Sequence, residues 1–369
     1  MTQGSAQDST WMTRALLNAR KAEGLTRPNP PVGAVLVKRG KWIADGVHRG
    51  AGQAHAEINA ISKVIDPKRL QGSTIYVTLE PCSTEGQTGA CTQAIIDAGV
   101  TRVVYSVRDP NPAHTGRARR ILKRAGIAVT EHLMQEDGQQ LITPFAHWVH
   151  HQRPYVRLKV AATLDGRLAD RNRQSQWISS PASRGLVQNM RKAADAVMIG
   201  VGTAIADDPS LLYRRAPRQN RIRVIVDTRG RLPLTSQVLN DAFASRTIVA
   251  TTKLAAPKRL QAIRAKGAAV WVLPQSQNRV SLRQLMRRLG REGILSVLCE
   301  GGGNIAHGLM QCDLVDELHT FLAPKCLGGE GLAMFAGQGW TLGKAPTLTF
   351  SEVRRVGPDI HVVATRQGA

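Results

Sequence analysis

The chain is poor in aromatic residues and cysteine, and it has no long hydrophobic run. Aromatic residues make up 4% of the sequence, whereas proteins that bind single-stranded nucleic acid need aromatic side chains on which bases stack. No apolar run reaches about 18 residues, so no transmembrane helix is expected. The amino-terminal residues also lack the apolar stretch of a secretory signal. Five widely spaced cysteines do not indicate a disulfide framework, so we expect free thiols in a reducing cytoplasm.

Acidic residues are scarce as well. The sequence has 50 Lys and Arg against 27 Asp and Glu, a net charge of +23, which attracts polyanions and phosphorylated small molecules. The basic residues form two clusters, one of Arg117, Arg119, Arg120, Lys123 and Arg124, and one of Arg214, Arg215, Arg218, Arg221 and Arg223. Two interpretations stay open for these clusters, a nucleic-acid surface and a solvated basic face.

The length of 369 residues and a hydrophobic content of 42% indicate two globular domains. Strand and helix patterns alternate along both halves, which is typical of layered α/β domains. Residues 141–153 are rich in His and Trp and show no strand pattern. We therefore predict domains over residues 1–146 and 153–369, joined by a linker over residues 147–152.

Local patterns predict individual elements. In the first half we expect strands over residues 32–37, 42–47, 74–79, 103–107 and 127–130, and helices over residues 11–23, 55–64, 92–98 and 119–125. Pro81 is expected at the start of a further helix. In the second half we expect strands over residues 155–161, 196–199, 223–226, 247–250, 270–273 and 294–299, and helices over residues 184–192, 282–289 and 305–310.

A split metal signature is the strongest chemical motif. His55-Ala56-Glu57 is followed, after a predicted strand, by Glu80-Pro81-Cys82 and then by Cys91. One imidazole and two thiolates suit a tetrahedral Zn²⁺ with its fourth position open to water, although ligand type alone also admits iron. Glu57 is then free to move protons, as the glutamate of zinc-dependent nucleobase deaminases does. The alternative is two unrelated buried cysteines and a surface histidine.

Three polar, glycine-bearing loops follow predicted strands in the second half, at residues 163–167, 200–211 and 300–304. The last contains Gly301, Gly302 and Gly303 directly before a helix, where backbone N–H groups can approach a phosphate. Open α/β sheets bind ligands at such strand ends. Tight packed turns would explain each loop equally well when it is taken alone.

Taken together, these motifs resemble the bifunctional deaminase/reductase family of riboflavin biosynthesis. The resemblance is carried in the first half by residues 27–34, Gly46-Val47-His48, residues 55–57, residues 79–82, Cys91 and residues 109–112, and in the second half by residues 158–167, 175–178, 207–209 and 300–302. It implies a cytidine-deaminase-like three-layer α/β/α domain followed by a dihydrofolate-reductase-like α/β domain.

The resemblance also implies a chemistry for each half. His55, Cys82 and Cys91 would hold Zn²⁺, and Glu57 would carry the proton in hydrolytic deamination of a phosphoribosylated diaminopyrimidinone. NADPH would then reduce the ribosyl group to ribityl. The substrate contacts of the first domain would be Asn29, His48, Asp109 and Asn111. In the second domain NADPH would contact Ala161, Trp177, Thr203, Asp207, Gly302 and Gly303, and substrate would contact Lys159, Ser175, Arg191, Leu211, Arg214 and Glu300.

As partners we expect a phosphorylated pyrimidine and a second copy of the chain, and neither nucleic acid nor a membrane. The sequence departs from the family pattern at Gln87, where a basic residue is usual, at Gly89-Ala90, where prolines are usual, and at Ile142, where Asn is usual. Losing a charge-assisted substrate contact costs about 1.5–3 kcal/mol. A chain with only the reductase at work is therefore one alternative. A nucleic-acid-binding deaminase is another, which would need neither the Asp207 nor the Glu300 motif.

Overall fold

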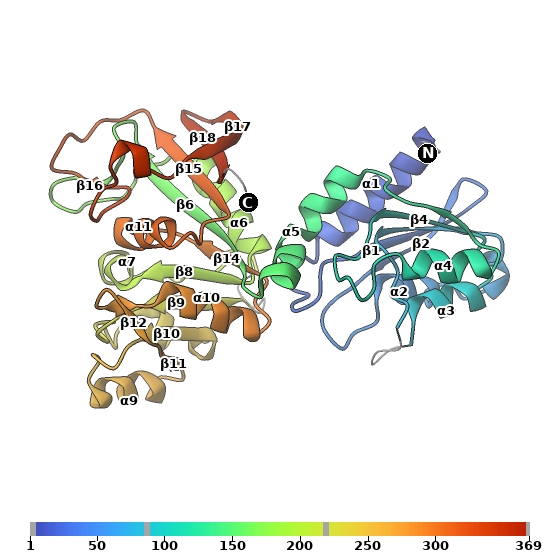
Figure 1. The fold of residues 1–369 in the computed structure, drawn as a ribbon, viewed down its shortest axis with the longest axis horizontal. Helices are drawn as coiled ribbons and strands as arrows, with labels where there is room; N and C mark the ends of the chain where they lie inside the picture. Colours follow the sequence, from blue (N-terminus) through green and yellow to red (C-terminus); the bar gives the residue numbers. More distant parts are fainter. Residues whose placement is uncertain (1–4, 85–88, 217–220, 367–369) are drawn as a thin grey trace. The chain divides into compact units, whose positions relative to one another are not determined.

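The structure is a computed structural model that describes residues 5–84, 89–216 and 221–366. The chain folds as two compact units, Met1–Gln152 and Arg153–Ala369 (Figure 1). No described helix combines the length and the apolar character needed to cross a membrane.

The first unit is built on a five-stranded mixed sheet with the strand order β2-β1-β3-β4-β5. Its strands are β1 (Gly33–Lys38), β2 (Lys41–Val47), β3 (Thr74–Leu79), β4 (Arg102–Val107) and β5 (Ala128–Thr130). β1 and β2 form the predicted antiparallel hairpin, whereas β3, β4 and β5 run parallel. The sequence patterns therefore located every strand of this sheet.

Helices cover both faces of this sheet. They are α1 (Ala6–Arg20), α2 (Ala56–Ile61), the 3-10 turn η1 (Pro67–Arg69), α3 (Cys91–Asp97), α4 (Arg117–Arg124) and α5 (Gln135–His151). Alternate residues of β1 point to opposite faces. Ala34 and Leu36 belong to a buried cluster with α2, α3 and α4, and Val35 and Val37 to a second cluster with α1 and Leu141 of α5. The expected three-layer α/β/α fold is thereby confirmed.

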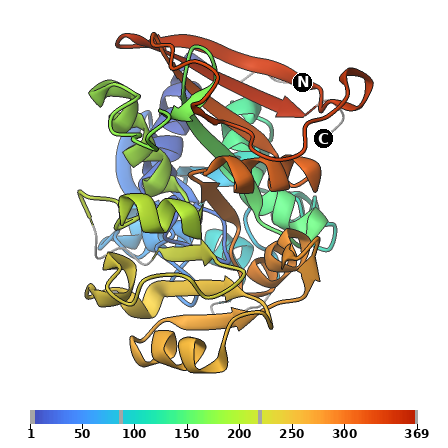
Figure 2. The same cartoon turned by 90° about the vertical axis from the view of Figure 1, so that its left-hand side faces the viewer.

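The second unit contains a nine-stranded sheet with the order β11-β10-β9-β8-β14-β6-β15-β18-β17. These strands are β6 (Tyr155–Thr163), β8 (Ala196–Gly200), β9 (Ile222–Val226), β10 (Thr247–Thr251), β11 (Ala269–Val272), β14 (Ser296–Cys299), β15 (Glu317–Ala323), β17 (Leu348–Val356) and β18 (Asp359–Arg366). Two short pairs join β7 (Arg167–Ala169) to β16 (Leu332–Ala333), and β12 (Gln275–Ser276) to β13 (Arg279–Val280). Figure 2 looks onto this unit, with the β17–β18 hairpin in red at one edge.

Helices also cover both faces of the larger sheet. They are α6 (Pro181–Ala193), α7 (Val201–Asp207), α8 (Gln237–Asn240), α9 (Pro257–Ala265), α10 (Leu282–Arg291) and α11 (Gly303–Gln311), with 3-10 turns η2 (Ala244–Arg246) and η3 (Leu342–Lys344). One buried cluster joins α10 and α11 to the sheet, and another joins α7, α8 and α9 to its opposite face. The α/β class expected for the second half is confirmed.

Several predicted elements differ from the observed ones. No helix begins at Pro81, because residues 80–84 are irregular and α3 starts at Cys91. α2 ends at Ile61 rather than near Val64. Residues 147–151, expected as part of a linker, form the last turns of α5, which accommodates Pro144 and carries Ile142 into the buried cluster.

The strands β15, β17 and β18 were not predicted from the sequence. β17 is exposed along almost its whole length and carries Arg354 and Arg355 among its apolar residues. The apolar-polar alternation that identifies a half-buried strand is therefore weak there. Pairing with β18 at the sheet edge, rather than burial, holds β17 in place.

Among the described residues of the second basic cluster, some are exposed and others are buried, and Arg218 lies outside the described residues. Arg221 and Arg223 are 2% and 0% exposed. Arg223 donates to both carboxylate oxygens of Asp241, at 2.6 and 2.9 Å, and to the backbone carbonyl of Val238. Arg221 donates to the carbonyls of residues 191 and 192. Both expectations for these two arginines, a nucleic-acid surface and a solvated face, are wrong, because they satisfy buried acceptors.

One buried carboxylate fastens α1 to the small sheet. Asp8 accepts hydrogen bonds from Tyr76 of β3 at 2.6 Å and from Arg102 of β4 at 2.8 and 3.0 Å. Asp8 and Ser5 also bond to each other reciprocally as a capping box. The hydrogen bonds from Arg102 hold the pKa of Asp8 well below its usual range, although burial acts in the opposite direction.

We expect Asp8→Asn to lower the free energy of unfolding by about 1.5–3 kcal/mol near pH 7, because charge-assisted hydrogen bonds are lost. A carboxyl whose pKa is depressed by folding stabilises the protein above the unfolded pKa of about 4 and ceases to do so as the pH falls. The difference between wild type and variant should therefore shrink in acid. Urea unfolding near pH 7 and near pH 3, about one unit below the unfolded pKa, measures both effects.

Asp137→Asn is the matched control, since Asp137 forms only an exposed ion pair with Arg20 at 3.5 Å. Such pairs contribute about 0–1 kcal/mol. Equal losses in the two variants would contradict the role assigned to Asp8.

Candidate active sites

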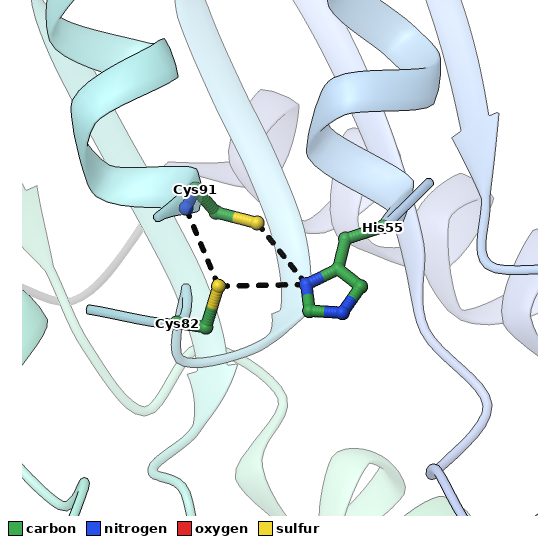
Figure 3. A group of neighbouring side chains, drawn as sticks. All are labelled: His55, Cys82 and Cys91. Carbon is green, nitrogen blue, oxygen red and sulfur yellow. Dashed lines mark hydrogen bonds between the residues drawn. The ribbon is translucent and has the colours of Figure 1, made fainter. Parts of the chain in front are cut away.

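The predicted metal ligands converge in the first unit (Figure 3). His55 is the residue before α2, Cys91 is the first residue of α3, and Cys82 lies in the irregular segment after β3. Nδ1 of His55 lies 3.2 Å from Sγ of Cys91 and 3.4 Å from Sγ of Cys82. All three donor atoms lie within 4.8 Å of one another.

These distances fit a zinc ion. With Zn–S near 2.3 Å and Zn–N near 2.1 Å, a tetrahedral centre places the nitrogen about 3.6 Å from each sulfur. The observed separations are slightly shorter. Nδ1 points between the two sulfurs, and the backbone N–H of Cys91 donates to Sγ of Cys82 at 3.3 Å. The donor set is therefore assembled around one point.

The two thiols influence each other strongly. Hydrogen bonds from Cys91, and then from His55, lower the pKa of Cys82. The Cys82 sulfur, together with burial, raises the pKa of Cys91. Without a cation the pair therefore consists of a Cys82 thiolate and a protonated Cys91 thiol, and binding of a dication to both sulfurs would release the remaining proton.

A close backbone approach sets the position of α2. A Cβ atom on Gly46 of β2 would lie 1.8 Å from the carbonyl oxygen of Ala56 and 2.6 Å from the nitrogen of Ala60. Glycine is therefore required at residue 46 for α2 to lie against β2. This contact fixes the start of the helix and with it His55 and Glu57.

Glu57 is almost completely buried beside the metal ligands but does not belong to the donor set. Burial, and then the negative charge of Cys82, raise its pKa to about 7. A carboxyl in this state is suited to accept and return a proton near neutral pH.

The predicted substrate contacts of the first unit surround the same cavity. The cavity has a volume of about 340 Å³ and is lined by Asn29, His48, His55, Glu57, Cys82, Asp109 and Asn111, among other residues. All four residues that the resemblance assigned to substrate in this half lie around the same cavity as Glu57 and two of the candidate metal ligands, His55 and Cys82.

Hydrogen bonds hold His48 and Asn29 in a fixed relation. Nδ1 of His48 lies 3.2 Å from the carbonyl oxygen of Ala54, and Nε2 lies 3.1 Å from Nδ2 of Asn29. Donation to Ala54 makes Nε2 the acceptor for the Asn29 amide. Burial lowers the pKa of His48, which agrees with a neutral ring.

Glu80 organises the loop that carries Asp109 and Asn111. Its buried carboxylate accepts backbone hydrogen bonds from Asp109 at 3.3 Å, Gly116 at 3.0 Å and Ala118 at 3.1 Å. The Glu80-Pro81-Cys82 motif alone does not predict this contact. The role of Glu80 is to connect the end of β3 to the loop between β4 and α4.

Sequence reasoning missed one whole wall of the cavity. Phe145, Trp148 and Val149 of α5 line it, and His114 lies in the Asp109–Asn111 loop region. The rings of Phe145 and Trp148 are stacked with centroids 6.3 Å apart. The spacing of residues 145, 148 and 149 is the i, i+3, i+4 pattern of a helix face, and this signal was available in the sequence.

A second group of predicted residues gathers at the carboxyl ends of β6, β14 and β8, which are adjacent parallel strands. Arg191 of α6 forms a bidentate ion pair with Glu300, with one contact at 2.8 Å, and donates to the carbonyl of Leu212 at 3.2 Å. Burial lowers the pKa of Lys159, which also faces the charges of Glu300, Arg191 and Asp207.

The glycine loop before α11 lies against α7. Gly301 and Gly302 have φ angles of 85° and 91°, and a Cβ atom on Gly302 would lie 2.9 Å from Oγ1 of Thr203. Gly303 is equally confined, because its Cβ would lie 2.4 Å from the carbonyl oxygen of Ala333. Glycine is therefore required at residues 302 and 303 for the loop to pack against Thr203 and Ala333.

The remaining predicted residues of the second unit differ in placement. Ser175 donates to Asp207 at 3.4 Å, and Ala161 lies on β6 two residues after Lys159. Trp177 is 57% exposed, with the Arg184 guanidinium 4.5 Å from its ring centre.

Leu211 and Arg214 occupy one loop in different surroundings. The Leu211 side chain is buried in the core, so only its backbone is available to a substrate. The exposed Arg214 donates its backbone N–H to Gln188 at 3.0 Å.

Comparisons with known proteins agree with this geometry. The family described as RibD C-terminal domain matches residues 154–362, and the family described as cytidine and deoxycytidylate deaminase zinc-binding region matches residues 5–107. The riboflavin biosynthesis protein RibD of Escherichia coli K12 is 37% identical over 373 residues, covering 97% of this chain and 99% of that protein. Its Aquifex aeolicus counterpart is 38% identical over 328 residues, covering 89% of each.

Solved structures lead to the same family. Acinetobacter baumannii RibD matches with a TM-score of 0.85 and 34% identity, covering 98% of this chain and 99% of that one. A Thermotoga maritima protein matches with a TM-score of 0.86, 34% identity and the same coverage. It is described as a diaminohydroxyphosphoribosylaminopyrimidine deaminase/5-amino-6-(5-phosphoribosylamino)uracil reductase.

Zinc content tests the metal centre directly. We expect the purified chain to carry about one zinc ion, and Cys82→Ser or Cys91→Ser to lose most of it, because a hard oxygen replaces a soft thiolate ligand. Metal analysis by mass spectrometry provides the measurement. Cys326→Ser, at an exposed cysteine outside the donor set, should retain wild-type zinc, and equal loss in this control would argue against the assignment.

NADPH binding tests the glycine loop. Gly302→Ala places a Cβ against Thr203 and forces alanine into a left-handed conformation that costs roughly 1–2 kcal/mol. We expect the NADPH dissociation constant to rise by about 5- to 30-fold in a fluorescence titration. Gly343→Ala is the control, since its Cβ meets nothing within 4 Å. Unchanged affinity in Gly302→Ala would contradict the placement.

Proposed function

We propose roles for individual residues from the premise that the chain belongs to the RibD family of riboflavin biosynthesis proteins. As a member of that family it is a bifunctional enzyme, with a zinc-dependent deaminase and an NADPH-dependent reductase in one chain. Both domains are present, so the two-step function holds over the reductase-only alternative.

The observation that carries the deaminase assignment is the shared cavity of the first unit. It brings Glu57 and the four expected substrate contacts to the metal donor set. We assign the deamination of a phosphoribosylated diaminopyrimidinone to this cavity, with Asn29, His48, Asp109 and Asn111 holding the pyrimidine through hydrogen bonds. Gln87 lies outside the described residues.

His55, Cys82 and Cys91 would hold Zn²⁺, and the ion would supply a Lewis acid that lowers the pKa of water to about 7. The protein itself moves the proton. Glu57 accepts a proton from the attacking water and delivers it to the departing amino group, which leaves as ammonia while a C–O bond replaces the C–N bond. Its burial beside the donor set keeps the carboxyl within reach of both positions and away from bulk water.

NADPH supplies a hydride for the second step. In our proposal Ala161, Trp177, Thr203, Asp207, Gly302 and Gly303 face the cofactor, and Lys159, Ser175, Arg191, Leu211, Arg214 and Glu300 face the sugar phosphate. The Arg191–Glu300 ion pair holds the end of β14 against α6, and Lys159 places a donor among these charges. On reduction, the hydride would add to the carbonyl carbon of the opened sugar, and the carbonyl oxygen would take up a proton from water.

We also propose that the chain works as a homo-oligomer in the cytoplasm. The exposed edge strand β17, with Phe350 71% and Val353 61% exposed, supports self-association, because unpaired edges and apolar patches favour pairing. Five free cysteines, two of them in the metal donor set, support a reducing compartment.

The decisive experiment measures NADPH oxidation with the aminated pyrimidine phosphate, and with its deaminated product in parallel. We expect wild type to oxidise NADPH with both compounds. Glu57→Gln should lower turnover of the aminated compound by about 10²–10⁴-fold, because it removes general acid–base catalysis, and should leave turnover of the deaminated compound unchanged.

Two outcomes would contradict the proposal. Loss of both activities in Glu57→Gln would show that the residue supports folding rather than proton transfer. Wild-type turnover of the deaminated compound alone would show that deamination belongs to another substrate.

A further inference from the structure

Under the proposed function, the charges that line the deaminase cavity do not match the negative charge of the substrate phosphate. Its substrate carries a phosphate, yet the described residues that line the cavity include the carboxylates Glu57, Glu80 and Asp109 and neither Lys nor Arg. Residues 85–88, with the sequence Glu-Gly-Gln-Thr, contain no basic side chain either. A phosphate needs hydrogen-bond donors, and charged ones are the strongest.

Three histidines line the cavity, and two of them are already engaged. Nδ1 of His55 faces the sulfurs of Cys82 and Cys91. Both ring nitrogens of His48 are used, one by the Ala54 carbonyl and the other by the Asn29 amide. Among the described lining residues, His114 is the remaining imidazole.

His114 combines a held backbone with an unused ring. Its loop is fixed on either side, since the Glu80 carboxylate accepts the backbone N–H groups of Asp109 and Gly116. Nδ1 of His114 is buried and has no hydrogen-bond partner among the described residues. Because Nδ1 is buried, Nε2 is the ring nitrogen that remains for a ligand in the cavity, and none of the described residues bonds to it.

The location relative to the pyrimidine contacts also fits. His114 lies three residues after Asn111, and its backbone N–H donates to the Asn111 carbonyl at 2.9 Å. A ligand bound by Asp109 and Asn111 therefore extends next to the imidazole. An imidazole donates a hydrogen bond in either protonation state.

We propose that His114 is a specificity-determining residue of the deaminase, which binds the phosphate of the phosphoribosylamino group where a lysine or arginine would otherwise be needed. This inference rests on the proposed function. It predicts that His114 contributes to the preference for a phosphorylated pyrimidine and not to the deamination chemistry.

The test measures ammonia release from two compounds, the aminated pyrimidine with its phosphoribosylamino group and the same compound without the phosphate. The readout is the ratio of their kcat/KM values. We expect His114→Ala to lower this ratio by about 10- to 100-fold, through KM for the phosphorylated compound, as expected for loss of a charge-assisted hydrogen bond. His114→Lys should keep most of the ratio.

Arg117→Gln is the matched control. Arg117 is an exposed cation three residues further along and does not line the cavity, so its removal should leave the ratio unchanged. Zinc content verifies that each variant is folded, and if His114→Ala fails that check, His114→Gln replaces it in the comparison.

The outcomes distinguish a failure of the role proposed for His114 from a failure of the proposed deaminase function. An unchanged ratio in a folded His114 variant, or an equal fall in Arg117→Gln, overturns the role of His114 while the deaminase assignment stands. A fall in kcat with both compounds alike would make His114 part of the general machinery and also overturns it. Failure of wild type to release ammonia from either compound overturns the proposed function itself.

Discussion

The enclosure of one nitrogen and two sulfurs within 4.8 Å is the constraint on which the first unit depends. Three separate stretches of chain must end at the same point to achieve it, one from the hairpin side, one from the end of β3 and one at the start of α3. This constraint explains two further residues. Gly46 and Glu80 each fix one of the segments that surround the cavity. The buried clusters on both faces keep the sheet rigid beneath them.

The second unit has the same kind of layered architecture, and several of its charged residues are not on the surface. Its charged residues are paired or held at strand ends, as Arg191 and Glu300 show, or are used deep inside the fold, as Arg223 shows. A highly basic sequence therefore does not imply an equally basic surface. Some of the basic residues that suggest a polyanion partner donate hydrogen bonds to buried acceptors instead. This pairing is visible only in the folded chain.

Residues whose role depends on local sequence could be predicted, and residues whose role depends on packing could not. The metal donors and Glu57 lie in short motifs, and the strands of the first sheet have clear periodicity, so both were found. Trp148 and His114 reach the cavity only because α5 and the loop before α4 pack there. The β17–β18 hairpin was not predicted because charged residues interrupt its alternation. The helix expected at Pro81 is absent because residues 80–84 are irregular, with Cys82 held by the backbone N–H of Cys91.

The helix α5 has a consequence for how the two activities can be separated. It supplies the aromatic wall of the deaminase cavity up to Val149 and ends at His151, immediately before the second unit begins at Arg153. A chain cut after residue 146 would lose Trp148 and Val149 from that wall. The chain can therefore be divided into two independent enzymes at only a few positions, because residues that line the deaminase cavity lie right beside the domain boundary.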